Sequence, residues 1–191
     1  MKLKIFTIVV IAATILSSCL KEGSDNRTPA MSLASPISST GDTLSFYVTD
    51  EAGIYRMDTI SVGDTVQFAV ATTGYYNNIV AFYLTCSDSA AIIVLPSVDK
   101  LDAVFSPRSD YEAGIFLLDG KGTDLIFPFK YVAVKPSKDT KIKLEVVSDA
   151  DFSGSGMMGA TNRSAISILT PIISVEEPIE EPEIEVPIVE D

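Results

Sequence analysis

The amino-acid sequence predicts an all-β protein folded as an antiparallel sandwich of two sheets. Apolar and polar residues alternate over several short windows, which is typical of strands that bury only one face. Clusters of Gly, Asn, Asp, Ser and Pro separate these windows. Seven to nine such windows fall within residues 43–172, and short strands at this spacing are typical of a β-sandwich.

The expected strands are residues 43–49, 63–71, 78–86, 91–95, 114–118, 124–134, 140–148 and 163–171. The clearest alternation is "TKIKLEVVS" at 140–148. Pro128 predicts an edge strand or a bulge, because proline cannot donate a ladder hydrogen bond. One short segment, 97–105, has a helical spacing of apolar residues after a candidate N-cap, Ser97, and we expect a crossover turn there.

Two stretches resemble bacterial immunoglobulin-like domains. "VGDTVQF" at 62–68 is similar to their second strand, and "VVSDAD…NRSAISILTPI" at 146–172 is similar to their last hairpin. The resemblance implies an Ig-like sandwich over residues 43–172. The cysteine pair and core tryptophan of antibody domains are absent. A jelly roll is the alternative.

The N-terminus predicts export and lipid attachment. A cationic start precedes an apolar run, Ile5–Leu16, that is too short to span a bilayer and fits a signal peptide over residues 1–18. The run ends in Leu16-Ser17-Ser18-Cys19, which resembles a bacterial lipobox. That resemblance implies cleavage before Cys19 and lipidation of its sulfur, with the membrane as a partner. Two or more acyl chains hold a protein stably on a bilayer.

Low-complexity segments flank the expected sandwich. Residues 19–42 are rich in Ser, Thr, Gly, Pro and charge, and we expect a flexible linker. Residues 173–191 combine proline with eight acidic residues and no base, which predicts a disordered acidic tail. The tail is a solubilising end or a docking segment for a basic partner. The whole layout resembles small, mostly uncharacterised surface lipoproteins of the Bacteroidota, which implies the outer membrane or the cell surface.

Composition argues against several classes of function. A net charge of −12 disfavours nucleic-acid binding, which depends on cations that neutralise phosphates. The chain has no histidine, so catalytic Ser-His-Asp and Cys-His systems lack their base. Metal sites also depend on imidazole or thiolate. We therefore expect no enzyme, no metal and no cofactor.

The "GYYNN" turn is the candidate ligand-binding loop. Tyr75 and Tyr76 offer rings that could stack on sugars, and Asn77 and Asn78 offer amides that could bond to hydroxyl groups. The alternative is an ordinary turn before a strand.

A second loop has part of the pattern of a calcium site. Asp149, Asp151, Ser153 and Gly154 occupy the first, third, fifth and sixth places of a calcium loop. The twelfth place is Ala160, so the bidentate carboxylate is missing. We expect a plain hairpin loop.

Four hydroxyl residues follow an aspartate and precede an aliphatic or small residue: Thr43, Thr59, Thr65 and Ser89. The pattern resembles the O-glycosylation motif of the Bacteroidota and implies modification of these hydroxyls. A turn leading into a strand produces the same tripeptide without a glycan.

Cys86 lies on the apolar side of its expected strand, and with Cys19 lipidated it has no partner in the chain. We expect a small buried hydrophobe, with an intermolecular thiol as the alternative.

Together these features predict a lipid-anchored envelope protein that presents a non-catalytic interaction module, accessory to an uptake or adhesion assembly. A carbohydrate-binding surface lipoprotein and a passive spacer are the alternatives.

Overall fold

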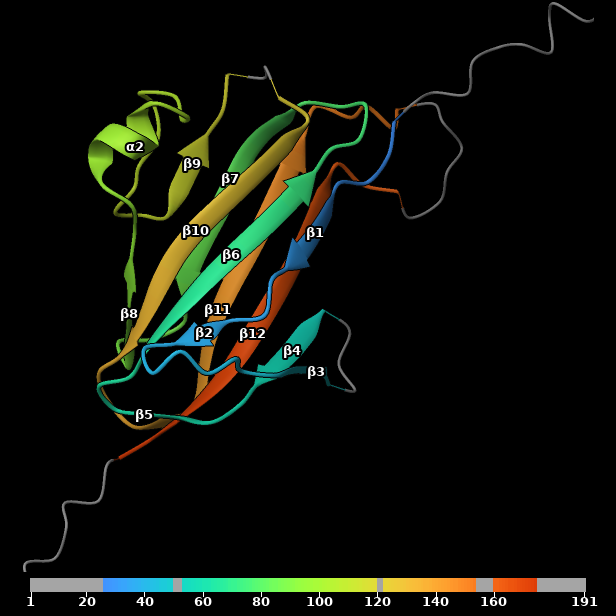
Figure 1. Ribbon diagram of the computed structural model, residues 1–191. Helices are drawn as coiled ribbons and strands as arrows, with labels where there is room; N and C mark the ends of the chain where they lie inside the picture. Colours follow the sequence, from blue (N-terminus) through green and yellow to red (C-terminus); the bar gives the residue numbers. More distant parts are fainter. Residues whose placement is uncertain (1–25, 50–52, 120–121, 154–159, 175–191) are drawn as a thin grey trace, which may run out of the picture.

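Two facing β-sheets form the body of the protein (Figure 1), and the predicted all-β, Ig-like sandwich is confirmed. The computed structural model describes residues 26–49, 53–119, 122–153 and 160–174. Sheet A contains β1 (Ala30–Leu33), β2 (Ile37–Ser38), β6 (Thr65–Thr73), β8 (Ala91–Val94) and β10 (Asp124–Ala133). Sheet B contains β3 (Phe46–Val48), β4 (Ile54–Met57), β5 (Ile60–Ser61), β7 (Ile79–Cys86), β9 (Ile115–Leu117), β11 (Ser137–Ser148) and β12 (Arg163–Ile173). One short helix, α2 (Val98–Asp102), connects β8 to β9.

Long antiparallel pairs form the centre of each sheet. Sheet A has the order β1-β6-β10-β8, with β2 also on β6. Sheet B has the order β3-β4-β12-β11-β7-β9, with β5 also on β12. The registers place Phe129 opposite Phe68 in sheet A and Leu144 opposite Leu84 in sheet B. Because side chains alternate along a strand, these registers turn one apolar row of each sheet towards the other.

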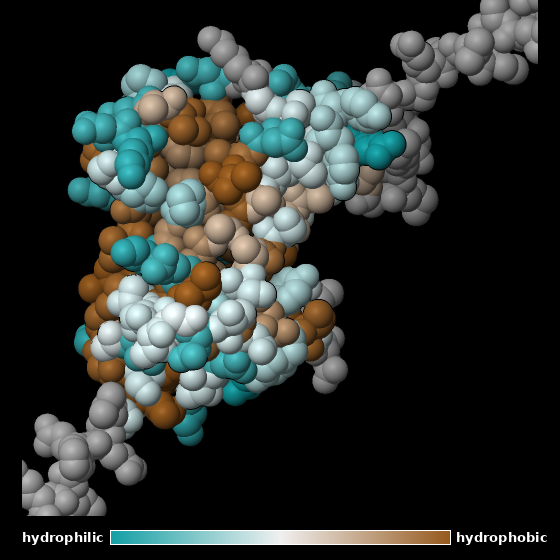
Figure 2. Space-filling model, viewed as in Figure 1, coloured by the Kyte–Doolittle hydropathy of each residue, from teal (hydrophilic) through white to brown (hydrophobic). Residues whose placement is uncertain are grey.

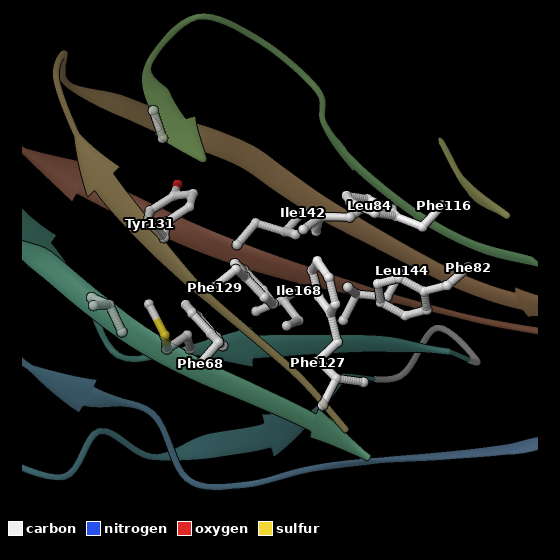
Figure 3. Packing of buried hydrophobic residues seen from close by; sticks show 14 of the residues in the cluster. Phe68, Phe82, Leu84, Phe116, Phe127, Phe129, Tyr131, Ile142, Leu144 and Ile168 are labelled. Carbon is white, nitrogen blue, oxygen red and sulfur yellow. The ribbon is translucent and has the colours of Figure 1, made fainter. Parts of the chain in front are cut away.

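Phenylalanine rings fill much of the space between the sheets (Figure 3). The rings of Phe68 and Phe129 stack with centroids 5.0 Å apart. Phe127 packs against Phe116 at 4.7 Å and against Phe82 at 5.1 Å. Aromatic pairs at these separations stabilise a core beyond the area that they bury. The core therefore links both sheets through one continuous aromatic cluster.

The prediction of a flexible linker over residues 19–42 was wrong for its second half, which contains two strands. Ala30–Leu33 pairs antiparallel with β6, and Ile37 and Ser38 pair with it further along. Met31 and Leu33 pack against the core from alternate positions. The small and polar residues between them hid this short alternation, so the sandwich begins before residue 43.

Sheet B also departs from the predicted antiparallel arrangement. β4 and β5 were not predicted from the sequence, and both pair parallel with β12. The expected strand 43–49 is reduced to β3, which among the described strands pairs with β4 alone, and Val48 is 70% exposed. An edge strand this short has few neighbours that could cover it.

The two local predictions, at Pro128 and at the helical segment 97–105, are each met in part. β8 pairs with β10 only from Lys130 onward, so Pro128 lies where β10 has β6 as its one partner. The first half of β10 is therefore an edge strand, as predicted for Pro128, whereas its second half lies between β6 and β8. In the segment 97–105, Ser97 makes no side-chain capping bond, and only Leu101 and Phe105 of the predicted face are buried.

The two ends of the described chain lie at opposite ends of the sandwich. In Figure 1 the chain enters β1 at one end, and β12 leaves at the other. Within the described ranges, no helix is long and apolar enough to cross a membrane.

Candidate functional site

The predicted ligand loop forms the turn between β6 and β7. Tyr75 has a positive φ of 60°, and its amide donates to Thr73 Oγ1 at 3.0 Å. Tyr75 and Tyr76 are 43% and 65% exposed. The Arg27 guanidinium carbon lies 5.5 Å from the centroid of each ring, within the range of a cation–π contact. The loop thus presents two tyrosines held against one arginine.

The two asparagines of the loop have structural partners. Asn77 Nδ2 donates to Asn26 Oδ1 at 2.9 Å, and Asn77 Oδ1 accepts the Arg27 amide at 3.3 Å. Asn78 donates its amide and its Nδ2 to the two carboxylate oxygens of Asp149, at 2.7 and 2.8 Å. These bonds use one donor and one acceptor position of the Asn77 side chain and one donor of the Asn78 side chain. They fix both asparagines in the turn, where Tyr75 and Tyr76 are the exposed side chains.

The aspartates of the calcium-like loop accept hydrogen bonds from protein groups. Both carboxylate oxygens of Asp149 accept from Asn78, and Asp151 Oδ1 accepts the Ser153 amide at 2.8 Å. The side-chain and backbone hydrogen bonds from Ser153 lower the pKa of Asp151. Gly154 lies outside the described residues. Across the described ranges, no three His, Cys, Asp or Glu side chains gather as a metal site.

The four candidate glycosylation hydroxyls lie in different settings. Thr43, Thr59 and Ser89 are exposed, whereas Thr65 is half-buried at the start of β6. Two of the preceding aspartates accept backbone amides within turns: Asp64 from Ser61 at 2.7 Å and Asp88 from Ala90 at 2.8 Å. Asp58 accepts the amide of Ser45, thirteen residues away, at 2.7 Å. The turn chemistry left open as an alternative is therefore present before Thr65 and Ser89, and the modification stays a prediction. The predicted lipidation site, Cys19, lies outside the described residues.

Cys86 lies at a groove on one open side of the sandwich, between β8 of sheet A and the end of β7 of sheet B. The groove measures about 730 Å³ and is lined mainly by apolar side chains, among them Leu84, Ile93, Leu95, Tyr111 and Phe116. Cys86 is half-buried in this lining, so the expectation of a buried hydrophobe was too strong. Burial raises the pKa of its thiol, and the nearby Asp88 carboxylate adds to the rise. The thiol is therefore a weak nucleophile at neutral pH.

A second surface, which we call the sheet A face, was not predicted from the sequence. It comprises the outward-facing apolar residues of β6, β8 and β10: Ala69, Ala71, Ile92, Val94, Ile126 and Pro128. Ile126 is 74% exposed, Ile92 54% and Val94 43%. Figure 2 shows this apolar area as a hollow across the front of the molecule, with polar residues on both sides.

The sheet A face departs from the usual pattern of an antiparallel sheet. Such a sheet normally alternates apolar residues inside with polar residues outside. Here Ile126 lies opposite Ala71, and Pro128 lies opposite Ala69, so apolar side chains meet across the ladder on the outer side as well. Lys130 is the one charged residue among the central pairs with β6 and β8. Exposed apolar patches of this kind mark interaction sites.

Comparisons with known proteins add little to this geometry. No protein-family model matches the chain. No curated protein matches it either. Among solved structures, the chain is similar to PapD-like (ASH) domain 7 of human CEP192, with 8% identity and a TM-score of 0.37, over 79% of this chain and 89% of that one. At this TM-score the likeness carries no argument about what the chain does.

Proposed function

We propose that this chain is a non-catalytic interaction domain of a lipid-anchored cell-envelope protein, and that its sheet A face binds a partner protein. The domain serves an uptake or adhesion assembly of the outer membrane or cell surface. The observation that carries the proposal is the apolar outer side of sheet A, which Ile126 dominates with 74% exposure. Water contact at such a surface is unfavourable, so covering it with an apolar protein surface stabilises a complex.

The position of the described ends supports the proposed anchoring. A tether before Asn26 would attach at one end of the sandwich, and the long strands of sheet A extend lengthwise from that end to the other, in alternating directions (Figure 1). The sheet A face would then lie along the side of an anchored domain, where a neighbouring envelope protein can reach it. The lipobox-like motif at Cys19 provides the tether.

Site-specific photo-crosslinking in the native membrane fraction tests both parts of the proposal. A photoreactive residue at Ile126 is expected to give one discrete protein adduct, and intact-mass analysis of the same material should show an acylated Cys19. The matched control is Val48, which is 70% exposed but lies on β3 of sheet B. Equal adducts from both positions, or no adduct from Ile126, would contradict the binding face. A free thiol at Cys19 would contradict the anchor.

Carbohydrate binding is the second candidate, because Tyr75 and Tyr76 are exposed and Arg27 holds both rings. Aromatic rings at a protein surface can stack on sugars. If this function is correct, replacing both tyrosines with alanine abolishes binding on a glycan array and leaves the Ile126 adduct unchanged. If neither tyrosine affects any glycan signal, the loop is an ordinary turn.

A further inference from the structure

The groove beside Cys86 has three walls, which come from both sheets. Leu95, directly after β8, lines one side, and Gly114, directly before β9, lines another. The end of β7, from Leu84 to Cys86, lines the third. α2 lies between β8 and β9 in the chain, on the left of Figure 1, so the polypeptide crosses from sheet A to sheet B on this side. The groove is thus a fixed feature of the crossing between the two sheets.

The size and lining of the groove fit a small organic molecule. Its volume of about 730 Å³ lies within the roughly 300–1,000 Å³ of most small-molecule sites. Leu84 and Phe116 belong to the buried core, and Ile93 packs against it. The Tyr111 ring stacks on the Phe116 ring with centroids 5.7 Å apart, and its hydroxyl donates to Asp102 at 2.8 Å. These contacts hold an apolar wall in place without a ligand.

The backbone along the groove argues against a peptide strand as the occupant. The Leu84 amide already donates to Gly114 O at 3.0 Å, so the Cys86 amide is the one donor that the described edge of β7 offers beyond it. A strand added to a sheet edge depends on a row of backbone hydrogen bonds. An occupant of this groove should therefore be held by its apolar surface and by side chains of the lining.

Glu112 is the one charged residue in the lining. It is exposed, and among the described residues its side chain takes part in no ion pair or hydrogen bond. The turn that carries it is closed by two hydrogen bonds: the Ala113 amide donates to Asp110 Oδ1 at 3.0 Å, and the Gly114 amide donates to Tyr111 O at 3.2 Å. The Tyr111 ring belongs to the same lining, and aromatic faces attract organic cations. A free carboxylate and an aromatic ring therefore border an apolar groove.

The charge around the groove also favours a cation. All lining residues fall within residues 84–119, which contain six acidic and two basic residues. Neither base of this range, Lys100 or Arg108, lines the groove. Lys141 of β11 lies on the outer side of sheet B, since its neighbour Ile142 faces the core. An excess of carboxylates raises the local concentration of cations and lowers that of anions.

We propose that this groove binds a small amphiphilic amine, a molecule with an apolar body and a protonated amino group. The apolar body covers the wall formed by Leu84, Ile93 and Phe116, and the ammonium group pairs with the Glu112 carboxylate. Of the sheet A face, only Val94 lines the groove. The site therefore goes beyond the proposed function, and either can fail while the other stands.

Protection of a thiol from alkylation tests the site, because Cys86 lines the groove. In a full chain carrying Cys19→Ser, Cys86 is the one thiol. Octylammonium, octanol and octanoate share one apolar chain and differ in charge, and each is added below its micellar range. Alkylation by iodoacetamide is followed at mildly alkaline pH, because burial raises the pKa of the thiol. Octylammonium should slow the reaction at a concentration about two- to fivefold lower than octanol, the gain from one exposed ion pair. Octanoate should need a higher concentration than octanol.

Glu112→Gln separates the ion pair from the apolar contact. This exposed substitution should leave the effect of octanol unchanged and bring octylammonium to about the level of octanol. Asp139→Asn removes an exposed carboxylate outside the groove and, as the matched control, should keep the preference for octylammonium. The proposal is overturned if none of the three probes slows alkylation, if octanoate acts as strongly as octylammonium, or if Glu112→Gln keeps the preference. The adduct expected from Ile126 depends on none of these outcomes, so the two proposals are tested separately.

Discussion

Replacing Phe127 with alanine is expected to lower the free energy of unfolding by about 3–5 kcal/mol, the range for removing a buried aromatic side chain. Phe127 is 2% exposed and lies between the sheets. Its ring packs against Phe116 at 4.7 Å, Phe82 at 5.1 Å and Phe105 at 5.7 Å. The substitution leaves a cavity where strands of both sheets and the α2 segment meet, so the structure can collapse around it only in part. Urea unfolding followed by circular dichroism measures the loss.

The neighbouring residue provides a matched control. Ile126 lies on the same strand but is 74% exposed. Ile126→Ala should change the free energy of unfolding by no more than about 0.5 kcal/mol, as for other surface substitutions. Similar losses from both variants would mean that the aromatic cluster does not carry the stability of the sandwich.

Gly114→Ala is expected to destabilise the protein by at least about 2 kcal/mol, because two costs add at this position. Gly114 has a φ of +70°, which costs an alanine about 1–2 kcal/mol. A Cβ atom there would also lie far inside van der Waals contact of the Leu84 carbonyl oxygen, which belongs to the backbone of β7. The last contact of β9 with β7 would have to open, at a cost of about 1–3 kcal/mol. Thermal and urea unfolding report the sum.

Gly41→Ala separates the two costs. Gly41 has a φ of +90°, but no atom lies within 4 Å of the position of its Cβ. This variant should therefore lose only about 1–2 kcal/mol, from backbone strain alone. Equal losses at the two glycines would show that contact with Leu84 contributes nothing.

The sequence predicted elements best where one face of a long strand is buried. Residues 140–148 alternate strictly, and the structure contains them within β11, paired on both sides. Here the local pattern and the tertiary environment agree, because inward and outward positions differ at every step. The strands at 65–73 and 79–86 were found for the same reason.

The missed elements had little local pattern to detect. Ile60 and Ser61 form a two-residue strand whose partners lie on β12, far away in the sequence. Parallel pairing of this kind leaves no turn signature between the strands. β1 is also short, and its alternation covers only Met31 and Leu33. Distant pairing, rather than propensity, makes these segments strands.

The candidate site was predicted in part. "GYYNN" does form an exposed turn with two tyrosines, but the partners of its asparagines, Asn26 and Asp149, come from remote segments. The sheet A face did leave a signal in the sequence. "LIFPFKYVAV" at 125–134 is almost continuously apolar, which is typical of a strand covered on both faces. Its outer positions, including Ile126, are uncovered in the isolated chain.

The arrangement of the two described ends has a mechanical consequence. β1 follows one end and pairs with β6, whereas β12 precedes the other end and pairs with β4, β5 and β11. A force pulling these ends apart would act along the strands (Figure 1), so it loads each ladder in shear. Hydrogen bonds loaded this way share the tension and must break together, whereas bonds loaded from a hairpin end open one at a time. A domain held at one end and pulled from the other would therefore resist extension.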